Sequence, residues 1–107
     1  MRPLVQTFTA LADETRFAIV ERLMDEGELP AGKLAAPVGI SAPAVSRHLK
    51  VLRGAGVIEQ RVVGTHRLYR VNPDAMRAIS GWTMDHRAFW EAGLDRLQAA
   101  LDAGKGE

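Results

Sequence analysis

The sequence predicts a mainly α-helical domain of the α+β class, with four helices, one small β-hairpin and a further helical region. Apolar residues recur at helical spacing in four stretches before residue 55 and again after residue 73. Between them, residues 57–71 are largely β-branched or aromatic and are interrupted by Gly64-Thr65, which is typical of a hairpin. The 107 residues, 47% of them hydrophobic and none of them cysteine, suit one globular domain without disulfides or thiolate metal sites.

The first two predicted helices cover residues 4–12 and 14–26. The apolar stripe of the first consists of Leu4, Val5, Phe8, Leu11 and Ala12. The second has Asp13 as its N-cap, Glu14 in its first turn and Gly27 after its last residue. Its predicted apolar stripe consists of Phe17, Val20, Leu23 and Met24.

Two shorter helices are predicted next, at about 30–38 and 42–54. Leu29-Pro30 opens the first, and Pro37 limits it to about two turns. Its buried side is predicted at Leu34, Ala35 and Val38. Gly39 can take the left-handed conformation after it, and Ser41 can cap the second helix. The second helix has a core side at Val45, Leu49 and Leu52. This spacing of helix, glycine turn and helix predicts a helix-turn-helix.

The hairpin of residues 57–71, with its loop near 63–66, completes a winged helix-turn-helix. Ile58, Gln60 and Val62 share one face of its first strand, and Tyr69 and Val71 share a face of the second. Asn72-Pro73-Asp74 then ends the strand and begins the C-terminal region 73–102. That region is one long helix or two, because Gly81 and Gly93 permit a kink. Residues 103–107 are predicted to fray.

Positive charge is concentrated in the middle of the chain. Residues 29–73 carry a net charge of +6, whereas residues 1–28 sum to −3 and residues 74–107 to −2. A basic middle between acidic ends is typical of a module that faces nucleic acid, and the alternative is chance clustering on a solvated face.

The outward face of the predicted helix 42–54 has small residues at its N-terminal end, which allow that end to enter a DNA groove. The predicted DNA contacts are Ser41, Ala42, Pro43, Ala44, Ser46, Arg47, His48, Lys50 and Arg53, together with Arg61, His66 and Arg67 of the hairpin. Ser46 and Arg47 are suited to base edges or phosphate, and Lys50 and Arg53 to phosphate or solvent. His48 is either a phosphate donor or a satisfied histidine at the margin of the core.

Four motifs follow one another along the chain. They are Ala10-Leu11-Ala12-Asp13-Glu14-Thr15-Arg16, Ser41-Ala42-Pro43-Ala44-Val45-Ser46-Arg47-His48-Leu49-Lys50-Val51-Leu52, the Arg61…Gly64…Tyr69 hairpin, and Phe89-Trp90-Glu91…Leu94-Asp95-Arg96-Leu97. In this order they resemble the ArsR/SmtB family of bacterial repressors over about residues 4–101. The resemblance implies a homodimer whose first and last helices pair across a two-fold axis. It also implies that the helix 42–54 of each subunit enters a major groove of a palindromic operator.

The apolar content of the C-terminal region supports a dimer independently, because one small core does not readily absorb so many large side chains. The predicted dimer interface consists of Leu4, Phe8, Leu11, Trp82, Phe89, Trp90, Leu94, Leu97 and Leu101. The alternative is that these residues close a core within one chain.

The chain departs from the metal-sensing members of the family that it resembles. It has no cysteine, and in place of the paired Asp-x-His…His-x-x-Glu pattern it has only Asp85-His86, so we expect no metal and no other cofactor. Three widely separated histidines with no nucleophile or phosphate-loop motif argue against an enzyme. No stretch is long and apolar enough to span a membrane and no signal-peptide core is present, so we expect a cytoplasmic protein.

The sequence therefore predicts a DNA-binding transcriptional regulator, most simply a homodimeric repressor. The alternatives are a winged-helix module that binds proteins rather than DNA, and a repressor released by a metal. The signal that releases the repressor is left open among a small molecule, a protein partner and control by abundance.

Overall fold

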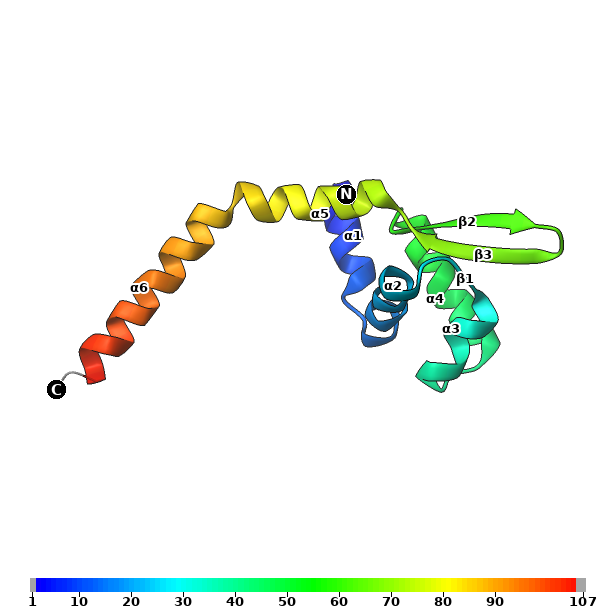
Figure 1. Ribbon diagram of the computed structural model, residues 1–107, viewed down its shortest axis with the longest axis horizontal. Coiled ribbons are helices and arrows are strands. Elements are labelled where there is room, and N and C mark those ends of the chain that lie inside the picture. Colours follow the sequence, from blue (N-terminus) through cyan, green and yellow to red (C-terminus); the bar gives the residue numbers. More distant parts are fainter. Residues whose placement is uncertain (1, 106–107) are drawn as a thin grey trace. The chain divides into compact units, whose positions relative to one another are not determined.

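Four helices with defined caps make up most of the first of two compact units, which divide after Arg77 (Figure 1). The computed structural model describes residues 2–105, without the side chains of Val38 and Lys105. The four helices are α1 (Pro3–Leu11), α2 (Glu14–Glu26), α3 (Ala31–Val38) and α4 (Ala42–Gly54). The bounds of α4 are those predicted from the sequence, and the other three differ by one residue at most.

The predicted caps are confirmed. Asp13 Oδ2 accepts a hydrogen bond from the backbone N–H of Arg16 at 3.0 Å, which fixes the start of α2. Ser41 Oγ accepts from the N–H of Ala44 at 3.3 Å and begins α4 in the same way. Gly39, with φ of 66°, takes the left-handed conformation that turns the chain between α3 and α4.

Three antiparallel strands form a small sheet in the order β1-β3-β2. They are β1 (Leu29–Pro30), β2 (Ile58–Val63) and β3 (His66–Val71). The loop predicted near 63–66 is a two-residue turn in which Gly64 has φ of 62°, the positive value that a type II′ hairpin turn requires at its first position. Pro30 is the N-cap of α3, in agreement with the predicted helix start, but Leu29 and Pro30 also form an edge strand that was not predicted, in which Leu29 pairs with Tyr69 and Pro30 with Leu68.

The core of this unit lies between the helices and the root of the hairpin. It consists of Ala10, Ile19, Val20, Leu23, Leu34, Val45, Leu49, Leu52, Val57, Ile58 and Tyr69. The three residues predicted for the core side of α4 are at most 1% exposed. Ala35 packs partly buried beside Leu34, as predicted, whereas the side chain of Val38 lies outside the described residues.

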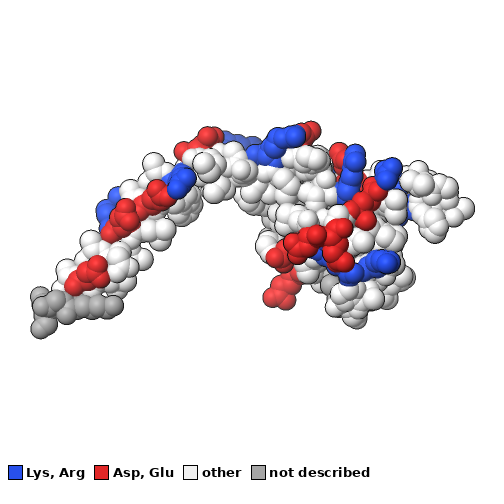
Figure 2. All heavy atoms as spheres, viewed as in Figure 1, with Lys and Arg blue, Asp and Glu red and all other residues white. Residues whose placement is uncertain are grey.

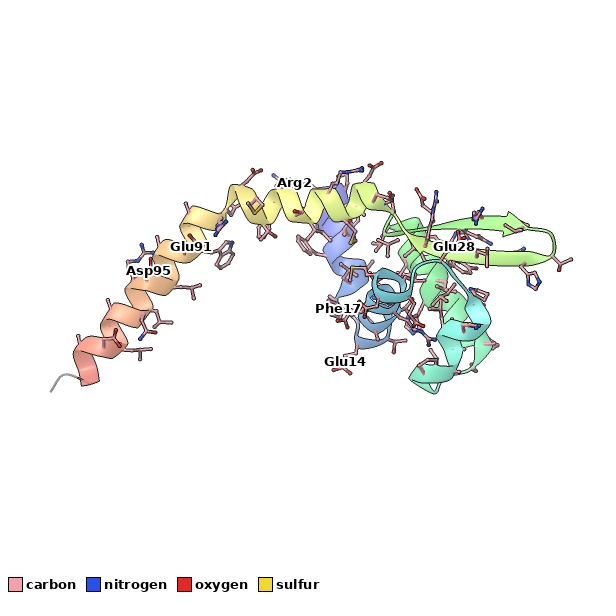
Figure 3. All side chains as sticks on the ribbon, in the orientation of Figure 1. Arg2, Glu14, Phe17, Glu28, Glu91 and Asp95 are labelled. Carbon is pink, nitrogen blue, oxygen red and sulfur yellow. The ribbon has the colours of Figure 1, made fainter. Side chains whose placement is uncertain are left out.

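The predicted apolar stripes of α1 and α2 are wrong in part. Thr7 and Ala10 are the buried residues of α1, whereas Phe8 is 39% exposed. The small side chains let α1 approach α2 and α4 closely, and the Thr7 hydroxyl is satisfied because it donates to the carbonyl of Pro3 at 3.0 Å. On α2, Phe17 and Met24 are about half exposed, and Figure 3 shows Phe17 pointing outward near Glu14.

The C-terminal region consists of two helices, α5 (Pro73–Asp85) and α6 (Arg87–Lys105), and most of it belongs to the second unit. The helices are separated at His86, and Gly81 and Gly93 lie inside them. The prediction of fraying is wrong for residues 103–105, which continue α6, while residues 106–107 lie outside the described part. None of the helices within residues 2–105 combines the length and apolar character needed to cross a membrane.

Candidate nucleic-acid interface

Helix α4 presents a polar face opposite its core side. Ser41, Ala42 and Pro43 at its N-terminal end are exposed, and Ala44 is half-buried. Farther along the helix, Ser46, Arg47, Lys50 and Arg53 are all exposed. The first turn is therefore narrow and bare of large side chains, which is the shape that lets a helix end approach base edges.

Four cationic side chains and the neighbouring His66 form what we call the free cation set: Arg47, Lys50 and Arg53 on α4, and Arg67 with His66 at the tip of the hairpin. All five are exposed, and within residues 2–105 none of them makes a hydrogen bond or an ion pair. Figure 2 shows acidic side chains gathered over α2 and reaching the root of the hairpin. The free cation set is therefore available to phosphates.

A groove lies between α4 and the beginning of β2. It is lined by Lys50, Arg53, Gly54 and Ile58 and has a volume of about 420 Å³. Two members of the free cation set therefore stand on the wall of a concave surface that adjoins both α4 and the hairpin. A charged backbone that followed this groove would pass both side chains.

Arg61, by contrast, is held by the fold. Its Nε and Nη2 donate to the two carboxylate oxygens of Glu28 at 2.7 and 2.6 Å, which is a bidentate pair. The hydrogen bond from Arg61 lowers the pKa of Glu28, and Glu28 in turn raises the pKa of Arg61. Figure 3 places Glu28 beside the hairpin. Sequence reasoning missed Glu28, because it lies 33 residues from Arg61 and no local pattern joins them.

The two faces of the hairpin differ in charge. On one face of the hairpin, Arg70 lies directly across from Glu59 and donates a hydrogen bond to it at 2.9 Å. Arg61 lies on the same face, so both arginines near the base of the hairpin are paired with carboxylates. Arg67 lies on the other face, which it shares with the buried Tyr69 nearer the root. Within the hairpin, unpaired positive charge thus lies only at the tip.

His48 has close partners on another helix. Its side chain is 25% exposed, and its Nδ1 lies 3.8 Å from Asp13 Oδ2 and 3.5 Å from Arg16 Nη1. The backbone N–H of Arg16, followed by the charges of Arg16 and His48, lowers the pKa of Asp13, although partial burial opposes this. Arg16 also donates through Nε to the carbonyl of Ala10 at 2.6 Å. These contacts are those expected of a satisfied histidine at the margin of the core.

The residues predicted for a dimer interface are spread over both units. In the first unit Leu4 and Leu11 are half-buried, and Phe8 is exposed. In the second unit all six are exposed, namely Trp82, Phe89, Trp90, Leu94, Leu97 and Leu101. Four of them recur every three or four residues along one face of α6, at 90, 94, 97 and 101. They therefore do not close a core within the second unit.

Metal-ligating side chains are scattered. Within the described residues 2–105, no three of the His, Asp and Glu side chains come close enough together to hold a metal ion. Asp85 and His86, adjacent in sequence, are both exposed.

Comparison with known proteins is consistent with this geometry. A family model described as a helix-turn-helix domain matches residues 11–61. The HTH-type transcriptional regulator Rv2034 of Mycobacterium tuberculosis is 41% identical over 98 residues, which cover 92% of this chain and 88% of that protein. The chain belongs to the ArsR family of winged helix-turn-helix transcriptional regulators.

Two further proteins show how far the likeness extends. The arsenical resistance operon repressor of Escherichia coli is 42% identical to this ArsR-family chain over 91% of its length and 80% of the repressor. The solution structure of Mb0332 from Mycobacterium bovis is described as a homodimeric winged helix-turn-helix DNA-binding domain. It matches with a TM-score of 0.65 and 27% identity, over 80% of this chain and 82% of that one. The family resemblance and the fold predicted from the sequence are both confirmed.

Proposed function

We propose that this ArsR-family regulator is a homodimeric repressor that binds a palindromic operator. Each α4 lies in a major groove, with Ser46 and Arg47 at the base edges, and each wing brings His66 and Arg67 to the backbone or to the adjacent minor groove. The observation that carries the proposal is the free cation set on α4 and the wing tip, beside paired cations at the root of the hairpin.

Phosphate contacts supply most of the affinity in this proposal. Lys50 and Arg53 line the groove between α4 and β2, and Arg67 stands at the wing tip. A dimer would offer six such side chains, so the logarithm of the binding constant would fall with the logarithm of salt concentration with a slope of about −5.

The second unit would supply the dimer interface of a single DNA-binding domain, together with Leu4, Phe8 and Leu11 from α1. The apolar stripe of α6 supports this role, because a helix that presents four large apolar side chains on one face is stable in water only when that face is covered. The homodimeric M. bovis relative supports it as well. Two-fold symmetry would set the half-sites about one turn of DNA apart.

Repression, rather than activation or catalysis, is the function we assign. The E. coli relative is named an operon repressor, and the relatives compared above are named as regulators and not as enzymes. We propose that the protein acts in the cytoplasm and binds DNA without a metal ion, since it has no cysteine.

The first experiment selects an operator from random duplexes and measures the affinity of the protein for it and for a random duplex by fluorescence anisotropy. We expect a steep salt dependence, and the same affinity with a chelator as with added zinc. Arg47→Ala is expected to cost about 1–3 kcal/mol on the operator and much less on the random duplex, because alanine cannot make the bidentate hydrogen bonds to a base.

Two outcomes would contradict the proposal. An affinity that does not vary with salt, or no binding to any duplex, would favour a winged-helix module that binds proteins. An equal loss on both duplexes for Arg47→Ala would make Arg47 a phosphate contact and remove its role in reading bases.

A further inference from the structure

His48 stands where three helices meet. It is on α4, one residue after Arg47, and its Nδ1 faces Asp13 and Arg16 at the start of α2. Arg16 also donates to the carbonyl of Ala10 on α1, so one guanidinium contacts both α1 and α4. The end of α1, the start of α2 and the middle of α4 are thereby joined by one polar cluster.

The cluster is already fixed on the α2 side. The same Asp13 oxygen that faces His48 accepts the capping hydrogen bond of α2 at 3.0 Å. Arg16 is half-buried and is held by its 2.6 Å hydrogen bond to Ala10. Asp13 and Arg16 cannot move with His48 without breaking these hydrogen bonds. The position of His48 is therefore set by Asp13 and Arg16.

Directional contacts matter here because, within the described residues, the other side chains that pack α4 against its neighbouring helices make apolar contacts, which are not directional. Val45, Leu49 and Leu52 bury α4 through apolar packing, which includes no hydrogen bond that would fix the rotation of the helix about its axis. Such a rotation would move Ser46 and Arg47, which flank the cluster, away from the base edges. The hydrogen bond that His48 Nδ1 accepts from Arg16 Nη1 at 3.5 Å opposes it, and Asp13 Oδ2 lies 3.8 Å from the same nitrogen.

We propose that Asp13, Arg16 and His48 form a positioning cluster that sets the rotation of α4, so that His48 acts through Arg47 and Ser46 and does not itself contact DNA. This inference rests on the proposed function, because it presupposes that α4 reads DNA. In this inference, His48 Nδ1 faces the other helices rather than the DNA. DNA recognition then depends on Arg16 and Asp13 as well, although neither contacts DNA.

The test compares His48→Ala with Lys50→Ala, its control on the phosphate-contacting side of the same helix. Operator and random-duplex affinities are measured from 50 to 300 mM salt, and folding is checked by circular dichroism. We expect His48→Ala to weaken operator binding about tenfold while random-duplex affinity and salt slope stay unchanged. Lys50→Ala is expected to weaken both and to flatten the slope, by about 0.9 for each phosphate that the variant no longer neutralises.

A double-mutant cycle covers the case in which His48→Ala folds poorly. Arg16→Lys keeps the positive charge but loses the planar fork, and His48→Gln keeps a side-chain acceptor for Arg16. If the two positions act together, His48→Gln retains part of the operator affinity, and His48→Ala costs much less when Arg16→Lys is already present.

Two results would overturn the inference. If His48 contacted phosphate, His48→Ala would flatten the salt slope and weaken binding to both duplexes equally. If the cluster did not position α4, His48→Ala would leave the operator affinity unchanged. Neither result resembles failure of the proposed function, in which the unaltered protein would itself show no salt-dependent binding to DNA.

Discussion

At the scale of single residues, Asp13 shows how one carboxylate can serve two contacts. It caps α2 and faces His48, and the N–H and charge of Arg16 hold its pKa below the ordinary value of 3.8. Because the folded pKa is the lower one, ionised Asp13 stabilises the fold fully above about pH 3.8. That contribution declines as the pH falls below this value and is gone below the folded pKa.

Two variants of Asp13 separate its cap from its charge. We expect Asp13→Asn to keep the cap, to be less stable than the unaltered protein at pH 7 and to approach it in stability as the pH falls below 3.8 and Asp13 becomes protonated. Asp13→Ala should be the less stable of the two variants throughout. Urea unfolding at pH 7 and pH 2.5, at one fixed protein concentration, measures both effects. A constant gap between the unaltered protein and Asp13→Asn would contradict the assigned role of the charge.

At the scale of helices and strands, the wing combines paired and free cations. Glu28 holds Arg61 and Glu59 holds Arg70, so a carboxylate offsets the charge of each of these two cations and reduces the positive charge offered to DNA. Removing a carboxylate from such a pair would convert a structural cation into a free one.

We therefore expect Glu28→Gln to tighten random-duplex binding at low salt and to steepen the salt slope by up to about 2 for a dimer, because both copies of Arg61 are released. Glu91→Gln is the matched control, since Glu91 accepts from Arg87 at 2.9 Å on α6, in the second unit. Anisotropy titrations between 50 and 300 mM salt provide the measurement. If the two variants give the same slope, Arg61 does not reach DNA.

The same scale shows what sequence patterns can predict. The bounds of α4, the caps at Asp13 and Ser41 and the left-handed Gly39 depend on neighbours within a few residues, and all were predictable. The strand β1 was not, since two residues carry no periodicity and pair only through β3.

Contacts between distant segments were equally out of reach. The free cations of the candidate interface could be named one by one from the sequence, but the pair that holds Arg61 and the partners of His48 lie more than 30 residues away. The buried Thr7 shows that hydrophobicity alone does not predict which side of α1 is buried. Because α1 packs closely against its neighbours, the small Thr7 is buried and the larger Phe8 beside it is exposed.

At the scale of the whole molecule, the apolar stripe of α6 argues for assembly. Phe89, Trp90 and Leu94 are each at least half exposed in a single chain, as are Leu97 and Leu101 farther along. Burying such side chains against a second copy stabilises by roughly 1.5–3 kcal/mol each.

Leu97→Lys should therefore convert the protein from a dimer to a monomer at micromolar concentration, because it places a charge within the stripe. Ala99→Lys introduces the same charge about half a turn away on α6 and should leave the dimer intact. Light scattering after size exclusion gives the molar mass of each variant. A dimer that survives Leu97→Lys, or an unaltered protein that is monomeric, would remove the stripe from the interface.

The two-residue turn at Gly64-Thr65 constrains how such a wing can evolve. Side chains alternate between the two faces of each strand. A single residue inserted in β3 between Arg67 and Tyr69 would therefore either turn the Tyr69 ring from the core to solvent or move the Arg67 side chain to the opposite face of the hairpin. Lengthening the wing while keeping both Tyr69 and Arg67 on their present faces requires two added residues in each strand, opposite one another. Descendants of this regulator can thus reach farther along DNA only in matched increments.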